Sequence, residues 1–453
     1  MSEKRGLWVL AAMLAVLLSL TGCQPSTGSD GGLQPVQHGD YSVFAWNDLG
    51  MHCLNPSYDT LVILPPYNTL VAQVVQRGDP PQVVTGSEVT GLTVEYRILD
   101  NTSSAGKRSY GQFWTYAQQL FGLGSPLPTD IGLAGNGLSG PLTENTGYFT
   151  AVGIPVVPVN DSGVWDPYQA AEITVKVSGT VVAQTRTTIP TSDEINCGKC
   201  HGTPTPGTAV FQDVLARHDA SEGTNLSTST PVLCAQCHGS PALGLVGPGS
   251  SGKYLSQAIH GFHGDLTEVN PSPDCYDCHP GAQTRCSRST RHTAADGNCI
   301  TCHGSLANVA STIQSSGRIP WAAEPKCVTC HGGVEQVDTG ATLYRNALGH
   351  GNLRCSACHG SPHAMVPTNN VDSFTNWDGY QSQQYQGYTG RVKSMGSCGV
   401  CHSSSRGDSE IASFAEVHGG PNPEQTNGCY ACHTAVPSTT AAWPHAFEWR
   451  NSN

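Results

Sequence analysis

Eight Cys-x-x-Cys-His motifs occupy the C-terminal half of the chain, and they constrain its fold more than any other feature. Two thiols at this spacing, followed at once by an imidazole, form the attachment signature of c-type haem. A single motif would also suit zinc or thiol redox chemistry, but eight copies leave those alternatives little support. The motifs span Cys197–His201, Cys234–His238, Cys275–His279, Cys299–His303, Cys327–His331, Cys355–His359, Cys398–His402 and Cys429–His433.

Each motif supplies three residues to one haem: two cysteines that bind the porphyrin and one histidine that binds the iron. The cysteines are Cys197, Cys200, Cys234, Cys237, Cys275, Cys278, Cys299, Cys302, Cys327, Cys330, Cys355, Cys358, Cys398, Cys401, Cys429 and Cys432. The histidines are His201, His238, His279, His303, His331, His359, His402 and His433. The sequence therefore predicts eight covalently bound haem c groups.

The second axial ligand decides whether a haem only transfers electrons or also binds a substrate. Methionine cannot serve eight irons, because only Met51, Met365 and Met395 lie beyond the first 22 residues. Eight further histidines lie in the haem region, and we predict that they complete the ligation: His218, His260, His263, His292, His350, His363, His418 and His445. The alternative at each position is a solvated or propionate-bonding histidine.

Two of these histidines form a His-x-x-His pair. His260 and His263 share one helical face, so they can reach the irons of two neighbouring haems. This arrangement resembles the His-x-x-His of tetrahaem cytochromes of the c3 type, which ligates two different haems. His363 is expected to serve a neighbouring haem rather than the one attached by its own motif. His38 and His52 lie outside the haem region and are expected to be structural.

The sequence divides into four parts. Residues 1–22 read as a signal peptide, because a basic start precedes an apolar run too short for a confident membrane span. Residues 23–37 form a flexible tether rich in Gly, Ser and Pro. Residues 38–192 are expected to form an all-β, sandwich-like domain. Residues 193–453 are expected to form an octahaem domain of short helices and loops.

Three segments of the β-rich part carry specific predictions. Residues 89–99 alternate like a half-buried strand, and residues 113–121 could form a short helix. Residues 172–177 and 181–189 flank Ser178-Gly179-Thr180, which predicts a hairpin. This part has no haem motif, so we expect it to serve docking or presentation rather than haem ligation.

The formal net charge is −12, and ionised haem propionates add further negative charge. Nucleic acid is therefore not an expected partner. Outside the haem motifs, three cysteines remain: Cys23, Cys53 and Cys286. In an exported, oxidised protein, Cys53 and Cys286 could pair as a disulfide between the two domains. Two separate thiols are the alternative, since sequence says nothing of the distance between them.

The segment Leu20-Thr21-Gly22-Cys23 resembles the bacterial lipobox. This resemblance implies that Cys23 is acylated after signal cleavage. Gln24 stands where the usual inner-membrane retention signal would be Asp, which implies anchoring in the outer membrane. Export agrees with the motifs, because bacteria attach haem to them outside the cytoplasm. An ordinary signal peptide with a chance cysteine is the alternative.

Residues 197–445 resemble the multihaem c-type cytochromes of metal-reducing bacteria, which carry electrons across and beyond the outer membrane. The eight motifs, the lipobox and the run Cys358-His-Gly-Ser-Pro-His363 carry this resemblance. Residues 45–53 and 64–70 are similar to an N-terminal module fused to such cytochromes. The resemblance implies electron transfer at the outer membrane, on the cell surface or alternatively on the periplasmic face. Its implied partners are other multihaem cytochromes, an outer-membrane porin complex or extracellular acceptors.

Two other functions remain open. One is an octahaem oxidoreductase with one open haem, which would require that a histidine such as His218 or His445 is not a ligand. The chain lacks the Cys-x-x-Cys-Lys motif that octahaem nitrite and tetrathionate reductases often use. The other is self-assembly into an extracellular filament, against which the lipid anchor argues.

Overall fold

The structure is a computed structural model. It describes residues 39–78, 80–202, 209–266, 274–280, 284, 286, 299–325, 343–348, 350–363 and 401. The expected signal peptide (1–22), tether (23–37) and acylated Cys23 lie outside the described residues. So do His38, His292, His418, His445 and the motifs Cys327–His331 and Cys429–His433.

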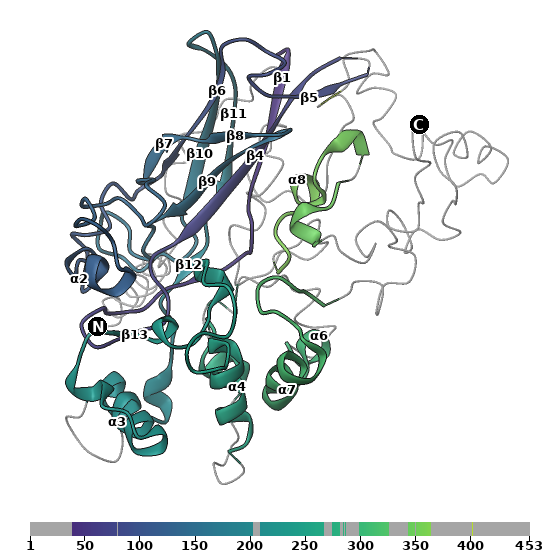
Figure 1. Cartoon of the computed structure of the whole chain (residues 1–453). Coiled ribbons are helices and arrows are strands. Elements are labelled where there is room, and N and C mark those ends of the chain that lie inside the picture. The colour runs from purple at the N-terminus through teal and green to yellow at the C-terminus, as the bar shows by residue number, and fades with distance from the viewer. Residues whose placement is uncertain are drawn as a thin grey trace, which may run out of the picture. The chain divides into compact units, whose positions relative to one another are not determined.

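The N-terminal part contains two antiparallel sheets (Figure 1). The first has the order β1-β4-β9-β8, with β5 also paired to β4. Its strands are β1 (Tyr41–Asn47), β4 (Asn68–Gln76), β5 (Gln82–Val84), β8 (Thr143–Asn145) and β9 (Tyr148–Ile154). The second has the order β11-β10-β6-β7, built from β6 (Leu92–Ile98), β7 (Ser139–Pro141), β10 (Ala170–Val177) and β11 (Thr180–Thr188).

The predicted hairpin is confirmed by the pairing of β10 with β11. Its two loop residues, Ser178 and Gly179, have φ of 50° and 83°, which is the left-handed conformation that a two-residue turn requires. The predicted strand is also confirmed, although β6 begins at Leu92; its buried and exposed residues alternate. Helix α2 (Gln112–Phe121) confirms the predicted helix.

Both sheets contribute to one hydrophobic core. Val43 and Leu70 come from the first sheet, while Val94 and Ile173 come from the second, and all four are essentially inaccessible to solvent. The prediction of an N-terminal β-rich part is therefore confirmed at the level of its sheets.

The first sheet is also covered on its other face. Strands β1 and β4 are buried almost throughout, whereas a strand with one solvated face would show alternating burial. The reason is a second cluster, in which Phe44 and Trp46 of β1 pack with Leu353 and Ala357. Ala357 belongs to a haem motif, so the β-rich part directly contacts the haem region.

Two short parallel strand pairs follow, one within the β-rich part and one between this part and the haem region. Strand β2 (His52–Cys53) pairs with β12 (Thr191–Ser192), and β3 (Leu61–Val62) pairs with β13 (Val232–Leu233). Because β13 immediately precedes Cys234, the second haem motif is fixed to the β-rich part by backbone hydrogen bonds.

The haem region is built from short helices, as predicted (Figure 1). Those described are η1 (Cys197–Lys199), α3 (Val210–Glu222), η2 (Leu226–Thr228), η3 (Cys234–Gln236), η4 (Pro241–Leu243), α4 (Leu255–Gly264), η5 (Cys275–Asp277), α6 (Ile300–His303), α7 (Leu306–Ser316), η8 (Tyr344–Asn346), η9 (His350–Asn352) and α8 (Cys355–His359). Among the described residues, no helix has the length and apolarity needed to span a membrane.

Candidate haem-binding sites

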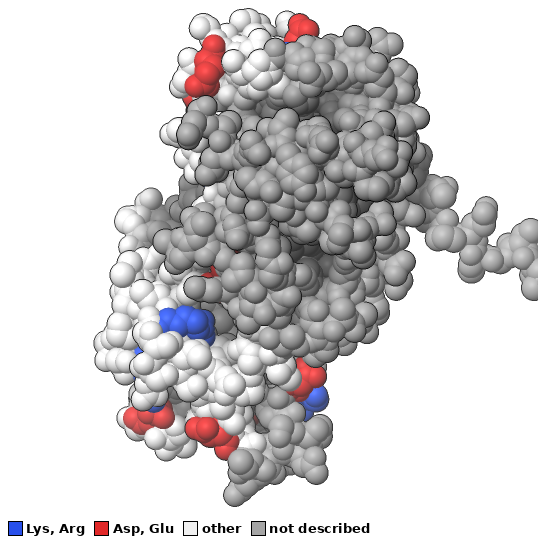
Figure 2. All heavy atoms as spheres, turned by 90° about the vertical axis from the view of Figure 1, so that its right-hand side faces the viewer, with Lys and Arg blue, Asp and Glu red and all other residues white. Residues whose placement is uncertain are grey.

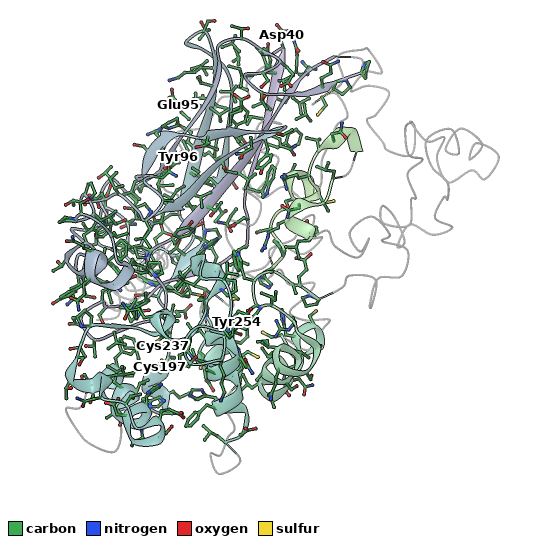
Figure 3. All side chains as sticks on the ribbon, in the orientation of Figure 1. Asp40, Glu95, Tyr96, Cys197, Cys237 and Tyr254 are labelled. Atoms are coloured by element: carbon green, nitrogen blue, oxygen red, sulfur yellow. The ribbon has the colours of Figure 1, made fainter. Side chains whose placement is uncertain are left out.

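We number the motifs as sites 1 to 8 in sequence order. The cysteines and histidines of sites 1 to 4, which are Cys197–His201, Cys234–His238, Cys275–His279 and Cys299–His303, are all described. In each, the backbone N–H of the histidine donates to the carbonyl of the first cysteine at 2.8–3.0 Å. One helical turn therefore holds both cysteines and the histidine together, as haem attachment requires. Figure 3 shows Cys197 and Cys237 among the short helices that follow the sheets.

Glycine follows the histidine at five of the eight sites, where it can end the helical turn in a left-handed conformation. Gly202 has φ of 83°. Gly304 and Gly360 also have positive φ, but their ψ values of −173° and −169° place them in an extended region that is essentially open to glycine alone. Gly239 differs from these three glycines. Its φ is not positive, and a Cβ there would lie 1.5 Å from the carbonyl oxygen of Gly247, so close approach explains this glycine.

Replacing Gly304 with alanine is expected to lower the free energy of unfolding by about 1–3 kcal/mol, the cost of a strained backbone conformation. A Cβ at this position would also lie 3.0 Å from Cβ of Asn308. Denaturant unfolding followed by circular dichroism measures the change. Gly124→Ala is the matched control, since it meets no atom within 4 Å and has no positive φ. Equal stability of the two variants would contradict the expectation.

The structure brings four motif histidines together with four of the additional histidines. The ring centroids of His201 and His263 lie 6.3 Å apart, and those of His238 and His218 also lie 6.3 Å apart. The corresponding distances are 5.9 Å for His279 with His260 and 6.4 Å for His303 with His363. Of the other additional histidines, only His350 is described, and only its backbone.

These separations fit one metal ion between each pair of rings. A metal–imidazole bond of about 2.0 Å, with the ring centre about 1.1 Å beyond the nitrogen, places two opposed ring centroids about 6 Å apart. The donor set also fits, because each pair lies beside two cysteines at haem-attachment spacing. The residues present therefore suit haem c with two histidine ligands.

Hydrogen bonds fix the second ring nitrogen in five of the eight histidines. Nδ1 lies within 2.7–3.1 Å of an oxygen atom in each case, which leaves Nε2 to bind iron. The five pairs are His201 with Asp213, His218 with Thr224, His238 with Ser251, His260 with the Ser256 carbonyl, and His263 with the Ile259 carbonyl. Such partners set the tautomer and orientation of a ligating imidazole.

Asp213 on α3 is a residue that the sequence analysis missed. It accepts hydrogen bonds from Arg217 and the Gly202 backbone, besides contacting His201. The hydrogen bond from Arg217 is the main cause that lowers its pKa to about 2, so it remains a carboxylate beside His201. The four-residue spacing of Asp213 and Arg217 on one helix was the only available signal, and it does not point to His201.

Burial shapes the electrostatics at site 3. It lowers the pKa of His279 to about 4, with smaller contributions from His260 and His303. The imidazole is therefore neutral at physiological pH, which is the form that ligates a metal.

Cys53 and Cys286 are brought near one another. Burial raises the pKa of the Cys53 thiol, and the proximity of Cys286 raises it further. The structure holds Cys53 as a thiol rather than as half of a disulfide, so the disulfide stays a prediction. In the β-rich part, His52 bonds Asp48 through Nε2 at 2.8 Å.

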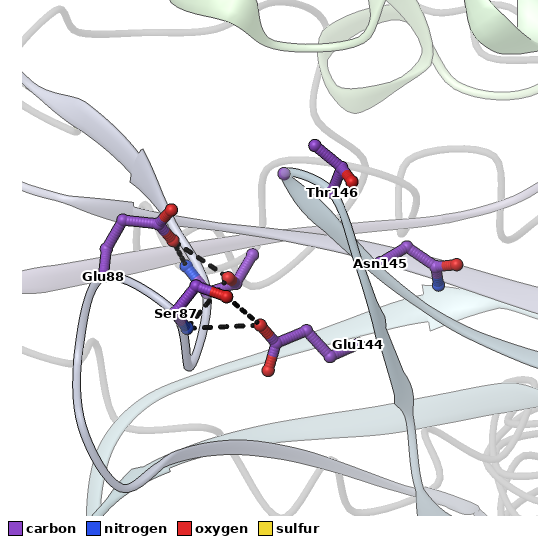
Figure 4. Close-up of a pocket in the computed structure, with 7 residues that line it drawn as sticks. Ser87, Glu88, Glu144, Asn145 and Thr146 are labelled. Carbon is purple, nitrogen blue, oxygen red and sulfur yellow. Dashed lines mark hydrogen bonds between the residues drawn. The ribbon is translucent and has the colours of Figure 1, made fainter.

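A separate hollow lies at the edge of the first sheet (Figure 4). It is lined by Glu88 and Glu144, whose carboxylates accept hydrogen bonds from Thr85 and Ser87. These bonds lower the pKa of both glutamates and stabilise the local loop. On the face in Figure 2, charged side chains of the described residues are scattered rather than gathered in a patch of one sign.

Residues 307–360 match the model of the family "Cytochrome c554 and c-prime". This segment contains the motifs of sites 5 and 6, and the match supports a c-type cytochrome with covalently bound haem and a role in electron transfer. Searches of curated proteins and of solved structures found no match.

Proposed function

We propose that this chain conducts electrons through eight covalently bound haem c groups, each ligated by two histidines. The observation that carries the proposal is the set of four histidine pairs with ring centroids 5.9–6.4 Å apart. In each pair, one histidine comes from a haem motif and the other is one of the eight additional histidines. The family match at sites 5 and 6 supports haem attachment further along the chain.

Haem c supplies reversible one-electron chemistry at iron, and two histidine ligands favour a low reduction potential. The protein residues would hold and orient this group: the cysteines would attach it, the paired histidines would ligate its iron, and Asp213 would fix the ring of His201. A site in which two histidines ligate the iron would transfer electrons without binding a substrate there.

A second part of the proposal concerns architecture and place. A sandwich-like β domain precedes an octahaem domain, and acylated Cys23 anchors the protein to the outer membrane. Partners would be other multihaem cytochromes, a porin complex or extracellular acceptors, and self-assembly into a filament would require proteolytic release from the lipid anchor. The support is the resemblance of the sequence to surface cytochromes and the lipobox at Cys23.

The haem count and ligation are testable on the intact protein. Denatured holoprotein should carry a mass excess of eight haems, and the ferrous protein should bind no carbon monoxide, because no iron has an open position. A mass excess of seven or fewer haems in fully matured protein contradicts the count. Carbon monoxide binding by one haem would instead favour the oxidoreductase, since it reveals an open iron.

Replacing Cys23 with alanine should release the protein from membranes with its haem content unchanged, because the lipid anchor provides the attachment. Membrane fractionation and haem staining measure both. Ser26→Ala in the tether is the matched control and should remain with the outer membrane. A Cys23→Ala protein that still fractionates with the outer membrane by itself would rule out the lipid anchor.

A further inference from the structure

We infer that the five haem sites whose connections lie in the described residues follow the spatial order 2–1–3–4–6, which differs from their order in the sequence. The inference rests on the proposed function, because it assumes that each histidine pair holds a haem. Its basis is that every neighbouring pair of sites in this order is joined by side chains or by one short segment that contributes to both.

Helix α3 joins sites 2 and 1. Its His218 lies opposite His238 of site 2 at a centroid distance of 6.3 Å. One and a half turns earlier on the same helix, Asp213 contacts Nδ1 of His201 in site 1 at 3.1 Å. A short helix that serves both sites keeps them adjacent.

Helix α4 joins sites 1 and 3. Its His263 pairs with His201 of site 1, and its His260 pairs with His279 of site 3. A direct ion pair supports this adjacency, because Lys199 within the site 1 motif bonds Asp277 within the site 3 motif. Two histidines three residues apart lie within one turn, so their two irons must be neighbours.

Sites 3 and 4 are joined through their first cysteines. The side chains of Cys275 and Cys299 lie next to each other, so the two points of haem attachment are adjacent. Helix α7, which follows site 4 directly, packs closely on α4 at two glycines. A Cβ on Gly264 would lie 2.7 Å from the backbone nitrogen of Ala307, and one on Gly261 would touch Ala310.

Residues 355–363 join sites 4 and 6. This segment contains the site 6 motif, and its His363 lies 6.4 Å from His303 of site 4, measured between ring centroids. Packing of Leu353 and Ala357 against Trp46 fixes the segment on the first sheet.

The order makes site 2 one end of this array, with sites 1, 3 and 4 between it and site 6. Each transfer oxidises one ferrous iron and reduces the next ferric iron by the same electron. Along these five sites, an electron that enters at site 2 therefore reaches site 3 after site 1.

The experiment injects single electrons at a known end of the fully loaded protein. Val246 is 96% exposed in the loop that follows the site 2 motif, so Val246→Cys carries a ruthenium-polypyridyl photosensitiser. Separate His218→Ala, His263→Ala and His260→Ala variants mark sites 2, 1 and 3 by their high-spin spectra. In each variant, transient absorption follows the reduction of the one high-spin haem. This haem should be reduced earliest in the site 2 variant, later in the site 1 variant and latest in the site 3 variant.

Injection from the other end is the matched control. Leu348 is 51% exposed and bridges to Arg354, which immediately precedes the site 6 motif. With the photosensitiser on Leu348→Cys, the order of arrival should reverse, so that site 3 is reduced before site 1 and site 1 before site 2. Arrival at site 3 before site 1 from Val246, or the same order from both ends, overturns the inference.

A cross-link tests one contact without electron flow. A carbodiimide should condense Lys199 with Asp277 into an amide, with loss of one water, and peptide mass spectrometry detects the product. Lys199→Arg keeps the charge but cannot form the amide. Absence of the cross-link in haem-loaded protein overturns the adjacency of sites 1 and 3. If the protein does cross-link but electrons never leave the site at which they enter, the proposed conduction is overturned and the spatial order is retained.

Discussion

Replacing His263 with alanine is expected to convert one low-spin haem to high-spin, and His260→Ala is expected to convert a different one. The double variant should convert two, because the structure pairs these histidines with His201 and His279 respectively. Loss of one axial imidazole leaves the iron five-coordinate or weakly ligated, and its spin state changes accordingly. Ferric optical and electron paramagnetic resonance spectra quantify the high-spin fraction.

His52→Ala serves as the control for histidine loss in general. His52 lies in the β-rich part and bonds Asp48, so its removal should leave all haems low-spin. If the double variant retains an unchanged low-spin spectrum, neither His260 nor His263 is a ligand. A high-spin signal in His52→Ala would instead place a residue of the β-rich part at an iron.

Replacing Trp46 with alanine is expected to lower the free energy of unfolding by about 3–5 kcal/mol, the usual cost of removing a large buried aromatic side chain. Trp46 is 1% exposed and packs in the cluster that includes Leu353 and Ala357. The substitution therefore weakens the contact between the first sheet and site 6. Denaturant unfolding is followed by far-ultraviolet circular dichroism, which reports the β-rich part, and by Soret absorbance, which reports the haem region.

Val181→Ala is the matched control on the second sheet. Its side chain is 50% exposed, so the change in stability should stay within about 0.5 kcal/mol. A loss below about 1 kcal/mol for Trp46→Ala would show that the sheet and site 6 do not depend on this contact.

The β-rich part contains no haem motif, but it packs closely against the haem region. Leu233 and Ala235 of the site 2 segment pack in a cluster with Phe113 of α2. Thr284, beyond site 3, donates to the carboxylate of Glu194. The sequence could not reveal these contacts. A run of apolar residues such as β1 indicates that a strand is buried, but it does not show which segment covers each face.

The sequence by itself determined the features that depend on residues close together in the chain. The haem motifs, the hairpin at Ser178-Gly179 and helix α2 all depend on residues within a few positions of each other, so their patterns are readable without a fold. The number of additional histidines in the haem region was also readable. The idea that His260 and His263 serve different haems followed from their spacing on one helical face.

Only the tertiary structure decided which histidine meets which motif. His263 meets His201 from far downstream, whereas His218 meets His238 from upstream, so no rule of sequence proximity predicts the pairs. Haem attachment is local because two cysteines and a histidine share one turn. The second histidine is non-local, since the path of α3 and α4 through the fold brings it to the opposite ring. Long-range packing therefore sets the order of the sites, and the local motifs carry no information about it.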